Sequence, residues 1–188
     1  MNRIYKIWLT LCSLLLTMTI YLVKSGLFIN QLSDHIENEY LKQCVISLPV
    51  FISCIVYFGV VIGCTALSIF IARFLNTDVI SKGSITTVET ANDAFLPSYL
   101  GYFFVALSIG DLISFVYVFA MIFIFILYSK ISYFNPVFLL FGYKFFHLTN
   151  VDGLKIVVIT KKDLKIPSEV QFSQLKRIND YTFITSEF

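Results

Sequence analysis

Charged residues are scarce in this sequence. Asp, Glu, Lys and Arg make up 14% of the 188 residues, while 57% are hydrophobic, including 20 Phe and 11 Tyr. So few charges are not expected on the surface of a soluble domain of this size. The apolar residues instead form blocks long enough to cross the hydrocarbon core of a bilayer, which is about 30 Å thick. The composition excludes an ordinary water-soluble protein and predicts an α-helical membrane protein.

Motifs for catalysis and for metal binding are also missing. The sequence contains no HExxH, P-loop or GxSxG motif. Its four cysteines form no CxxC pair, and three of them fall inside apolar blocks, so neither a disulfide framework nor a metal site is indicated. The two histidines, His35 and His147, fall on opposite sides of the predicted membrane. We therefore predict no enzymatic activity, no cofactor and no metal.

The apolar blocks predict four transmembrane helices, at about residues 7–23, 45–72, 93–109 and 112–128. The last two come from one apolar run, Phe95–Tyr128, in which Asp111 is the one charged residue. A single helix through this run would be about 51 Å long, too long for one crossing. Gly110 suits the end of a helix and Asp111 suits the N-cap of the next. We therefore predict that Asp111 caps a helix at the outer interface; an intramembrane proton or ion site is the alternative.

The basic residues are distributed unequally between the predicted loops. Of the 14 Lys and Arg residues, Lys24 and Lys42 lie in residues 24–44, and the other 12 lie at the termini, in the middle loop or in the tail. Because basic residues remain on the cytoplasmic side, both termini should be cytoplasmic. This asymmetry accounts for the net charge of +2, so no direct contact with nucleic acid is expected.

Two glycines in the second block are candidate helix-packing residues. Gly59 and Gly63 lie one turn apart in GVVIG. Small side chains at this spacing allow two helices to approach closely in lipid. The pattern serves packing inside one subunit as well as packing between copies, and the sequence leaves both open.

The chain divides into a transmembrane domain, residues 1–130, and a tail, residues 131–188. Within the first, the polar residues 76–94 predict a cytoplasmic loop. The tail begins with an apolar segment that is too short to span and is broken by Pro136, and we place this segment at the membrane interface.

The rest of the tail predicts a small β-rich (α+β) cytoplasmic module. Two strands are expected to meet at a hairpin turn at Asp152-Gly153. Ser168 and Gln171 fit a capping box that opens a short helix, and YTFIT, residues 181–185, predicts a final strand. Phe172, Leu175 and Ile178 should share the buried side of that short helix. A unit this small is marginal alone, so it should lean on lipid, on copies of itself or on another protein. Its candidate effector-docking residues are Lys155, Lys161, Lys162 and Lys165.

Three segments carry a resemblance to a known family. ANDAFLPSYLGYFF, NPVFLLFGYKFFHLT and LKIVVITKK resemble KwaA, the membrane component of the bacterial Kiwa anti-phage defence system. The resemblance extends over essentially the whole chain. It implies a multi-pass protein of the inner membrane that forms a homo-oligomer such as a tetramer and contacts membrane lipids. It further implies a sensor or scaffold subunit that detects infection and relays it to a cytoplasmic effector of the KwaB type.

The main alternative is an oligomeric pore or holin-like toxin that permeabilises the membrane. Such a protein needs a polar stripe along one helix. The hydroxyl residues of the first two blocks form only broken stripes: Ser13, Thr17, Thr19, Ser53, Thr65 and Ser68. A membrane enzyme is the least favoured class, because no acid–base or metal cluster is apparent.

Overall fold

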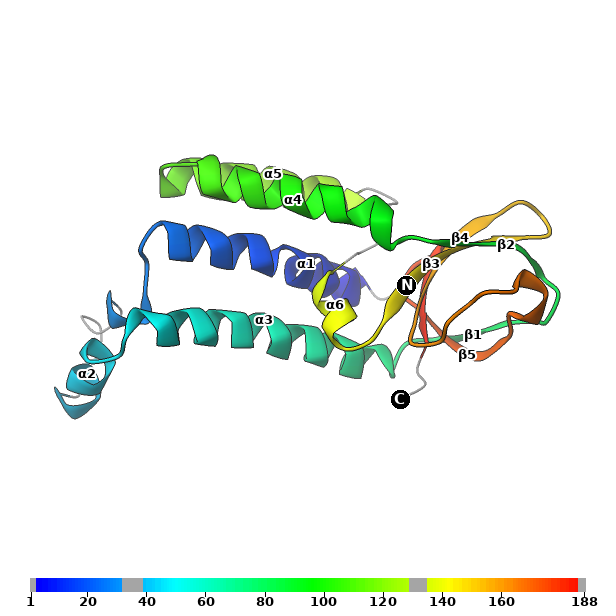
Figure 1. Ribbon diagram of the computed structural model, residues 1–188, viewed down its shortest axis with the longest axis horizontal. Coiled ribbons are helices and arrows are strands. Elements are labelled where there is room, and N and C mark those ends of the chain that lie inside the picture. The colour runs from blue at the N-terminus through cyan, green and yellow to red at the C-terminus, as the bar shows by residue number, and fades with distance from the viewer. Residues whose placement is uncertain (1–2, 32–38, 129–134, 186–188) are drawn as a thin grey trace.

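The computed structural model describes residues 3–31, 39–128 and 135–185. Long helices occupy one end of the elongated molecule and a curled β-sheet occupies the other (Figure 1). The helices are α1 Arg3–Lys24, α2 Glu39–Ile46, α3 Val50–Ala72, α4 Asn92–Ser108, α5 Leu112–Tyr128 and α6 Val137–Leu140. Helix α1 is central, since it contacts α3 as well as α4 and α5.

The long helices follow the predicted apolar blocks with shifted starts, and α1 begins at Arg3, four residues before the predicted block. Helix α5 has the predicted bounds, and α4 begins and ends one residue before the predicted ones. The block predicted from residue 45 instead begins a helix at Val50, because Pro49 has an extended backbone (φ −65°, ψ 145°) and separates α3 from α2. A proline is tolerated at the start of a helix but not in its interior.

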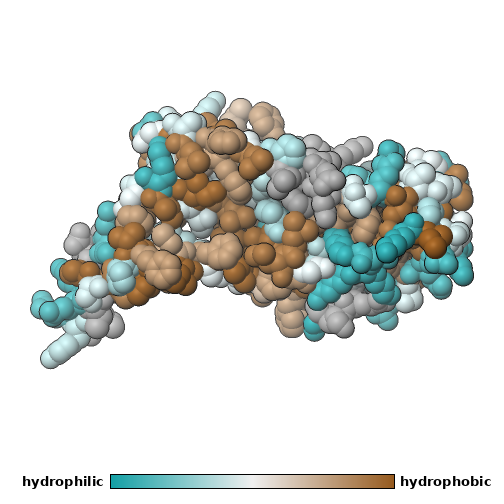
Figure 2. Space-filling view, viewed as in Figure 1, coloured by the Kyte–Doolittle hydropathy of each residue, from teal (hydrophilic) through white to brown (hydrophobic). Residues whose placement is uncertain are grey.

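Among the described residues, two helices are long and apolar enough to cross a membrane, over Ile4–Lys24 and Val50–Ala72. The prediction of four such helices is therefore not supported, because the apolar portions over Tyr99–Ser108 and Leu112–Tyr128 are shorter. Hydrophobic residues cover the helical end in Figure 2, while hydrophilic residues gather over the sheet and around α2. This distribution indicates association with a membrane.

In the described part of the chain, the sheet has six strands in the order β1-β5-β6-β4-β3-β2. Their bounds are β1 Thr77–Ile80, β2 Ile85–Thr90, β3 Lys144–Asn150, β4 Lys155–Thr160, β5 Phe172–Arg177 and β6 Thr182–Thr185. All neighbours are antiparallel except β4 and β6, which run parallel. Strands β1 and β2 lie at opposite edges, yet residues 81–84 alone connect them. The sheet must therefore curl until its edges approach each other, which gives an open barrel.

The prediction that residues 76–94 form a loop is wrong. Strands β1 and β2 arise from this segment and pair with β5 and β3 of the tail. The barrel thus takes strands from both sides of the predicted boundary at residue 130. Both of these strands lie at the edges of the sheet, and most of their side chains are exposed. Exposed positions accept polar residues, so the segment lacks the hydrophobic pattern from which a strand is predicted.

The β3–β4 hairpin and the last strand agree with the sequence analysis. At the turn, Gly153 takes φ +80°, a left-handed conformation that suits glycine. The Asn150 side chain accepts hydrogen bonds from the backbone N–H groups of Asp152 at 3.0 Å and Leu154 at 2.9 Å.

The short helix predicted after Pro167 is not formed. Residues Pro167–Glu169 make one 3₁₀ turn, η2, and the chain then enters β5. Phe172 and Leu175 are both buried as predicted, although a regular strand would place residues three apart on opposite faces. The β1–β5 register shifts by one residue between them, so β5 carries a bulge. The bulge produces a spacing of three that imitates a helix.

Candidate functional site

One hydrophobic cluster joins the helices to the barrel, and we call it the joint. It draws on the N-terminal part of α1, the end of α3, the start of α4, α6 and one face of the sheet. The joint consists of Tyr5, Leu9, Ile69, Ala72, Leu75, Ala91, Tyr99, Phe138, Tyr143, Phe145, Ile159, Ile178 and Ile184. A second cluster, which includes Phe146, Leu148 and Val158, fills the barrel itself. Successive residues of β3 point to opposite faces of the sheet, so Phe145 packs in the joint and Phe146 packs in the barrel.

Phe138 of α6 lies at the centre of the joint. Its side chain is fully buried, and its ring contacts Tyr143 and Phe145 edge-to-face, with centroids 5.9 and 6.2 Å apart. Gly142, at φ +78°, ends this short helix and turns the chain into β3. Of the segment predicted to lie at the interface, Asn135, Val137 and Phe138 are buried, whereas Leu139 and Leu140 are exposed. Residues 131–134 fall outside the described residues.

Asn135 fastens this segment to two long helices at once. Its side chain is fully buried. The amide Nδ2 donates to the Cys12 carbonyl of α1 at 3.4 Å and to the Thr65 hydroxyl of α3 at 3.0 Å. Its Oδ1 accepts from the Val137 N–H at 3.0 Å. A buried amide with these partners specifies one arrangement of α1, α3 and α6.

Hydroxyl side chains line the contact between α1 and α3. Ser68 is the centre of this seam: its hydroxyl accepts from Trp8 Nε1 at 2.9 Å, and its carbonyl accepts from the Tyr5 hydroxyl at 3.0 Å. The buried serines and threonines of α1 and α3 are Thr10, Ser13, Thr17, Ser53, Thr65 and Ser68. Most of the serines and threonines considered for a pore stripe are thus buried between helices of one chain, and Thr19 is half-buried.

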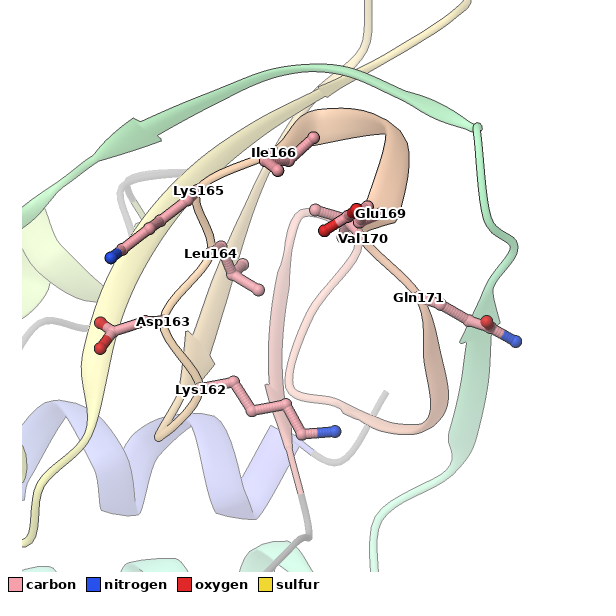
Figure 3. Close-up of a pocket in the computed structure, with 8 residues that line it drawn as sticks. All are labelled: Lys162, Asp163, Leu164, Lys165, Ile166, Glu169, Val170 and Gln171. Carbon is pink, nitrogen blue, oxygen red and sulfur yellow. The ribbon is translucent and has the colours of Figure 1, made fainter.

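A hollow of about 390 Å³ lies on the barrel surface beside residues 161–171. It is lined by Lys162, Asp163, Leu164, Lys165, Ile166, Glu169, Val170 and Gln171. In Figure 3, Leu164 and Glu169 point toward the middle of the hollow from opposite sides, while Lys165 and Gln171 point away from it. The lining combines an apolar floor with charges of both signs, which suits a peptide or protein segment better than a small apolar ligand.

Asp163 anchors this loop to the barrel. Its carboxylate forms an ion pair with Lys144 of β3. The hydrogen bond and charge of Lys144, followed by the charge of Lys165, lower the pKa of Asp163. The carboxylate is therefore ionised at neutral pH, and it offsets part of the positive charge of the loop.

Three of the four candidate docking lysines lie together. Lys161 and Lys162 place their ammonium groups 5.0 and 6.0 Å from the ring centroids of Tyr143 and Phe172, within the range of cation–π contacts. Lys165 follows on the same loop. Lys155 begins β4, six residues before Lys161, which is about 20 Å along an extended strand. The structure therefore separates Lys155 from the other three.

The remaining candidates lie apart from the joint. A Cβ built on Gly59 or Gly63 meets no described atom within 4 Å, so neither glycine packs against another helix in the described part of this chain. Asp111 precedes α5, and its Oδ2 accepts the Ser114 backbone N–H at 2.8 Å, which is the N-cap contact that the sequence predicts. Among the described residues, no group of three His, Cys, Asp or Glu side chains is placed to hold a metal ion.

The comparison with protein families decides the identity of this arrangement. A family model described as "Anti-phage protein KwaA" matches residues 5–184, from the first helix to the last strand of the barrel. The chain belongs to the KwaA family. Searches of curated proteins and of solved structures found no match. Anti-phage defence is therefore the function of the family to which this fold belongs, and KwaA proteins take their place in a defence system.

Sequence reasoning missed the residues that organise the joint of this KwaA-family chain. The sequence predicts no special role for Asn135 or Tyr143, and none for Ser68 as a hydrogen-bonding centre. One signal was available: Asn135 is an amide inside an apolar stretch and is followed by Pro136. A polar side chain in such a place usually has a buried partner, but the sequence does not indicate which helix supplies it.

Proposed function

We propose that this KwaA-family chain is a sensor and scaffold subunit of an anti-phage complex in the bacterial inner membrane. In this proposal α1, α3, α4 and α5 cross the membrane, and the barrel lies in the cytoplasm. The subunit detects infection at the membrane and relays it to a cytoplasmic effector of the KwaB type. The chain itself performs no catalysis.

The surface of the helices supports the membrane part of this proposal. Helix α5 has 17 residues, which gives a length of about 25 Å, close to the thickness of a hydrocarbon core. Its Ile113, Tyr117 and Phe125 side chains are 84%, 67% and 63% exposed. Apolar surface of this extent requires lipid or another protein surface. Lipid together with further copies of the chain, as in a homo-oligomer, would cover it.

The joint is the observation that carries the relay. Helix ends and barrel strands share one hydrophobic cluster, so the described helices and strands pack directly against each other. Because packed cores resist continuous deformation, a change in the spacing of α1 and α3 must repack Phe138 and move α6. A relay of this kind needs two arrangements whose populations the stimulus shifts. The hydrogen bonds of Asn135 to α1 and α3 stabilise one of these two arrangements.

The loop at residues 161–171 is the proposed docking surface. It begins directly after β4, whose Ile159 belongs to the joint. It also presents Lys162 and Lys165 beside the hollow. An acidic segment of the effector would complement these charges, and charge complementarity mainly sets partner choice and the rate of association.

A pair of charge reversals tests the docking surface. The double variant Lys162→Glu/Lys165→Glu should lose copurification of the effector and protection from phage. Its matched control, Lys82→Glu/Lys155→Glu, has the same net charge and should retain both. Equal effector binding by the two double variants would refute docking at this loop.

A leakage assay separates the relay from a pore. Expression of the chain without effector or phage should leave membrane potential and dye exclusion unchanged. Leakage under these conditions would instead favour the holin-like alternative, because a pore needs no partner.

A further inference from the structure

An apolar groove lies between α1 and α3 at the end of the helices that is remote from the barrel. Its volume is about 510 Å³, within the range of small-molecule sites. Figure 2 shows the helical surface hollowed between these two helices. The groove is lined by Leu16, Thr19, Ile20, Val23, Lys24, Cys54, Tyr57, Phe58 and Leu107.

The polar groups of the groove gather at its outer end. The Tyr57 hydroxyl donates to the Leu27 carbonyl at 2.7 Å, so this group closes the groove toward the loop. The Lys24 ammonium donates to the carbonyl of Ile109, the C-cap residue of α4. An ammonium has three donors, and the exposed Lys24 side chain brings a positive charge to the mouth of the groove.

We propose that this groove binds one acyl chain of an anionic phospholipid whose phosphate rests against Lys24. The inference rests on the membrane location proposed above, because it needs the groove to face lipid. The apolar walls contributed by Leu16, Ile20 and Phe58 receive the chain. Lys24, at the last residue of α1, lies where basic side chains reach the interface.

The shape of the site selects this occupant. A helix from a second copy is about 10 Å across and does not enter a groove of this volume, whereas an extended hydrocarbon chain does. Lys24 adds charge complementarity to a phosphate-bearing headgroup. A bound lipid would touch α1, α3 and α4 at once and hold their outer ends in a fixed relation.

Lipid titration followed by native mass spectrometry tests the proposal. The detergent-solubilised full-length protein is titrated with phosphatidylglycerol and, separately, with phosphatidylcholine. The wild type should bind phosphatidylglycerol more tightly, and Lys24→Gln should weaken that binding about fivefold, the effect of one basic residue near an anionic lipid. The matched control Lys6→Gln, at the other end of the same helix, should bind like the wild type. Cys54→Phe, which fills the groove, should reduce the binding of both lipids.

Several outcomes would overturn the proposal. If the wild type binds the two lipids equally, Lys24 does not recognise the phosphate headgroup. If Cys54→Phe binds lipid as tightly as the wild type, the lipid does not occupy this groove. Complete displacement of lipid by inorganic phosphate would leave an anion site without the acyl chain. Carbonate extraction of membranes is measured in parallel for each variant. Protein that inserts but shows no lipid preference refutes this inference alone, whereas protein that is extracted refutes the membrane location as well.

Discussion

At the scale of single residues, Asn135 has the largest structural consequence. It is a buried amide that bonds to the backbone of α1, to a side chain of α3 and to the first turn of α6. Most contacts in the joint are apolar and tolerate sliding, whereas these hydrogen bonds, like that of Tyr5 to the Ser68 carbonyl, have direction. Asn135 therefore sets the register of the tail against the helices, and Phe138 supplies the burial.

Replacement of Asn135 by Ala should destabilise the protein by about 1–3 kcal/mol, the cost of removing a buried hydrogen-bonding side chain. Thermal unfolding in detergent measures this change. The control Ser108→Ala, which removes an exposed hydroxyl bonded within its own helix, should unfold like the wild type. Asn135→Ala should also reduce protection from phage at equal protein level. Full protection by a destabilised variant would separate Asn135 from the relay.

Asp111 is expected to act as a cap with no role in proton transfer. The Ser114 backbone N–H lowers the pKa of its carboxyl group, so the ionised cap is present at neutral pH and is lost as the pH falls through this lowered pKa. Asp111→Asn should retain expression and defence, because Asn caps comparably, and its cap should no longer depend on pH. Loss of defence by this variant at normal expression would favour an ion site instead.

At the scale of elements, the sequence predicts those whose pattern is strong and local. Helix α5 was placed because an unbroken apolar run follows a capping residue, and β3 and β4 because a turn lies between two β-rich runs. Strands β1 and β2 are not predicted, because their residues are polar and their partners lie more than 50 residues away in the sequence. The signal of an edge strand depends on its neighbours, and a sequence read locally does not contain it.

The candidate site divides in the same way. The charges of Lys161, Lys162 and Lys165 were visible because they are close together in the sequence. The joint was not visible, because it gathers residues from Tyr5 to Ile184 and each of them looks like an ordinary core residue. The bulge in β5 is a third case, since it gives Phe172 and Leu175 a helical spacing inside a strand.

At the scale of the whole molecule, cysteine labelling tests the orientation. In a background with the four native cysteines replaced by Ser, Gln31→Cys should react with an impermeant maleimide in intact spheroplasts. Lys82→Cys, in the turn between β1 and β2, should react only after the membrane is permeabilised. The basic asymmetry of the loops gives this expectation. Labelling of Lys82→Cys in intact spheroplasts would invert the proposed topology.

The insertion of α4 and α5 between two paired strands has a consequence for assembly. Strands β2 and β3 form a ladder although both helices separate them in sequence, so residues 90 and 144 must be on the same side of any bilayer. The chain between them therefore crosses an even number of times: both helices insert, or neither does. If a nascent chain inserts only one of these two helices, β2 and β3 lie on opposite sides of the membrane and cannot pair. The hydrophobic residues of the joint then remain exposed. In the topology proposed above, completion of the barrel would distinguish correctly inserted chains from faulty ones, and the faulty ones would expose apolar segments to quality-control proteases.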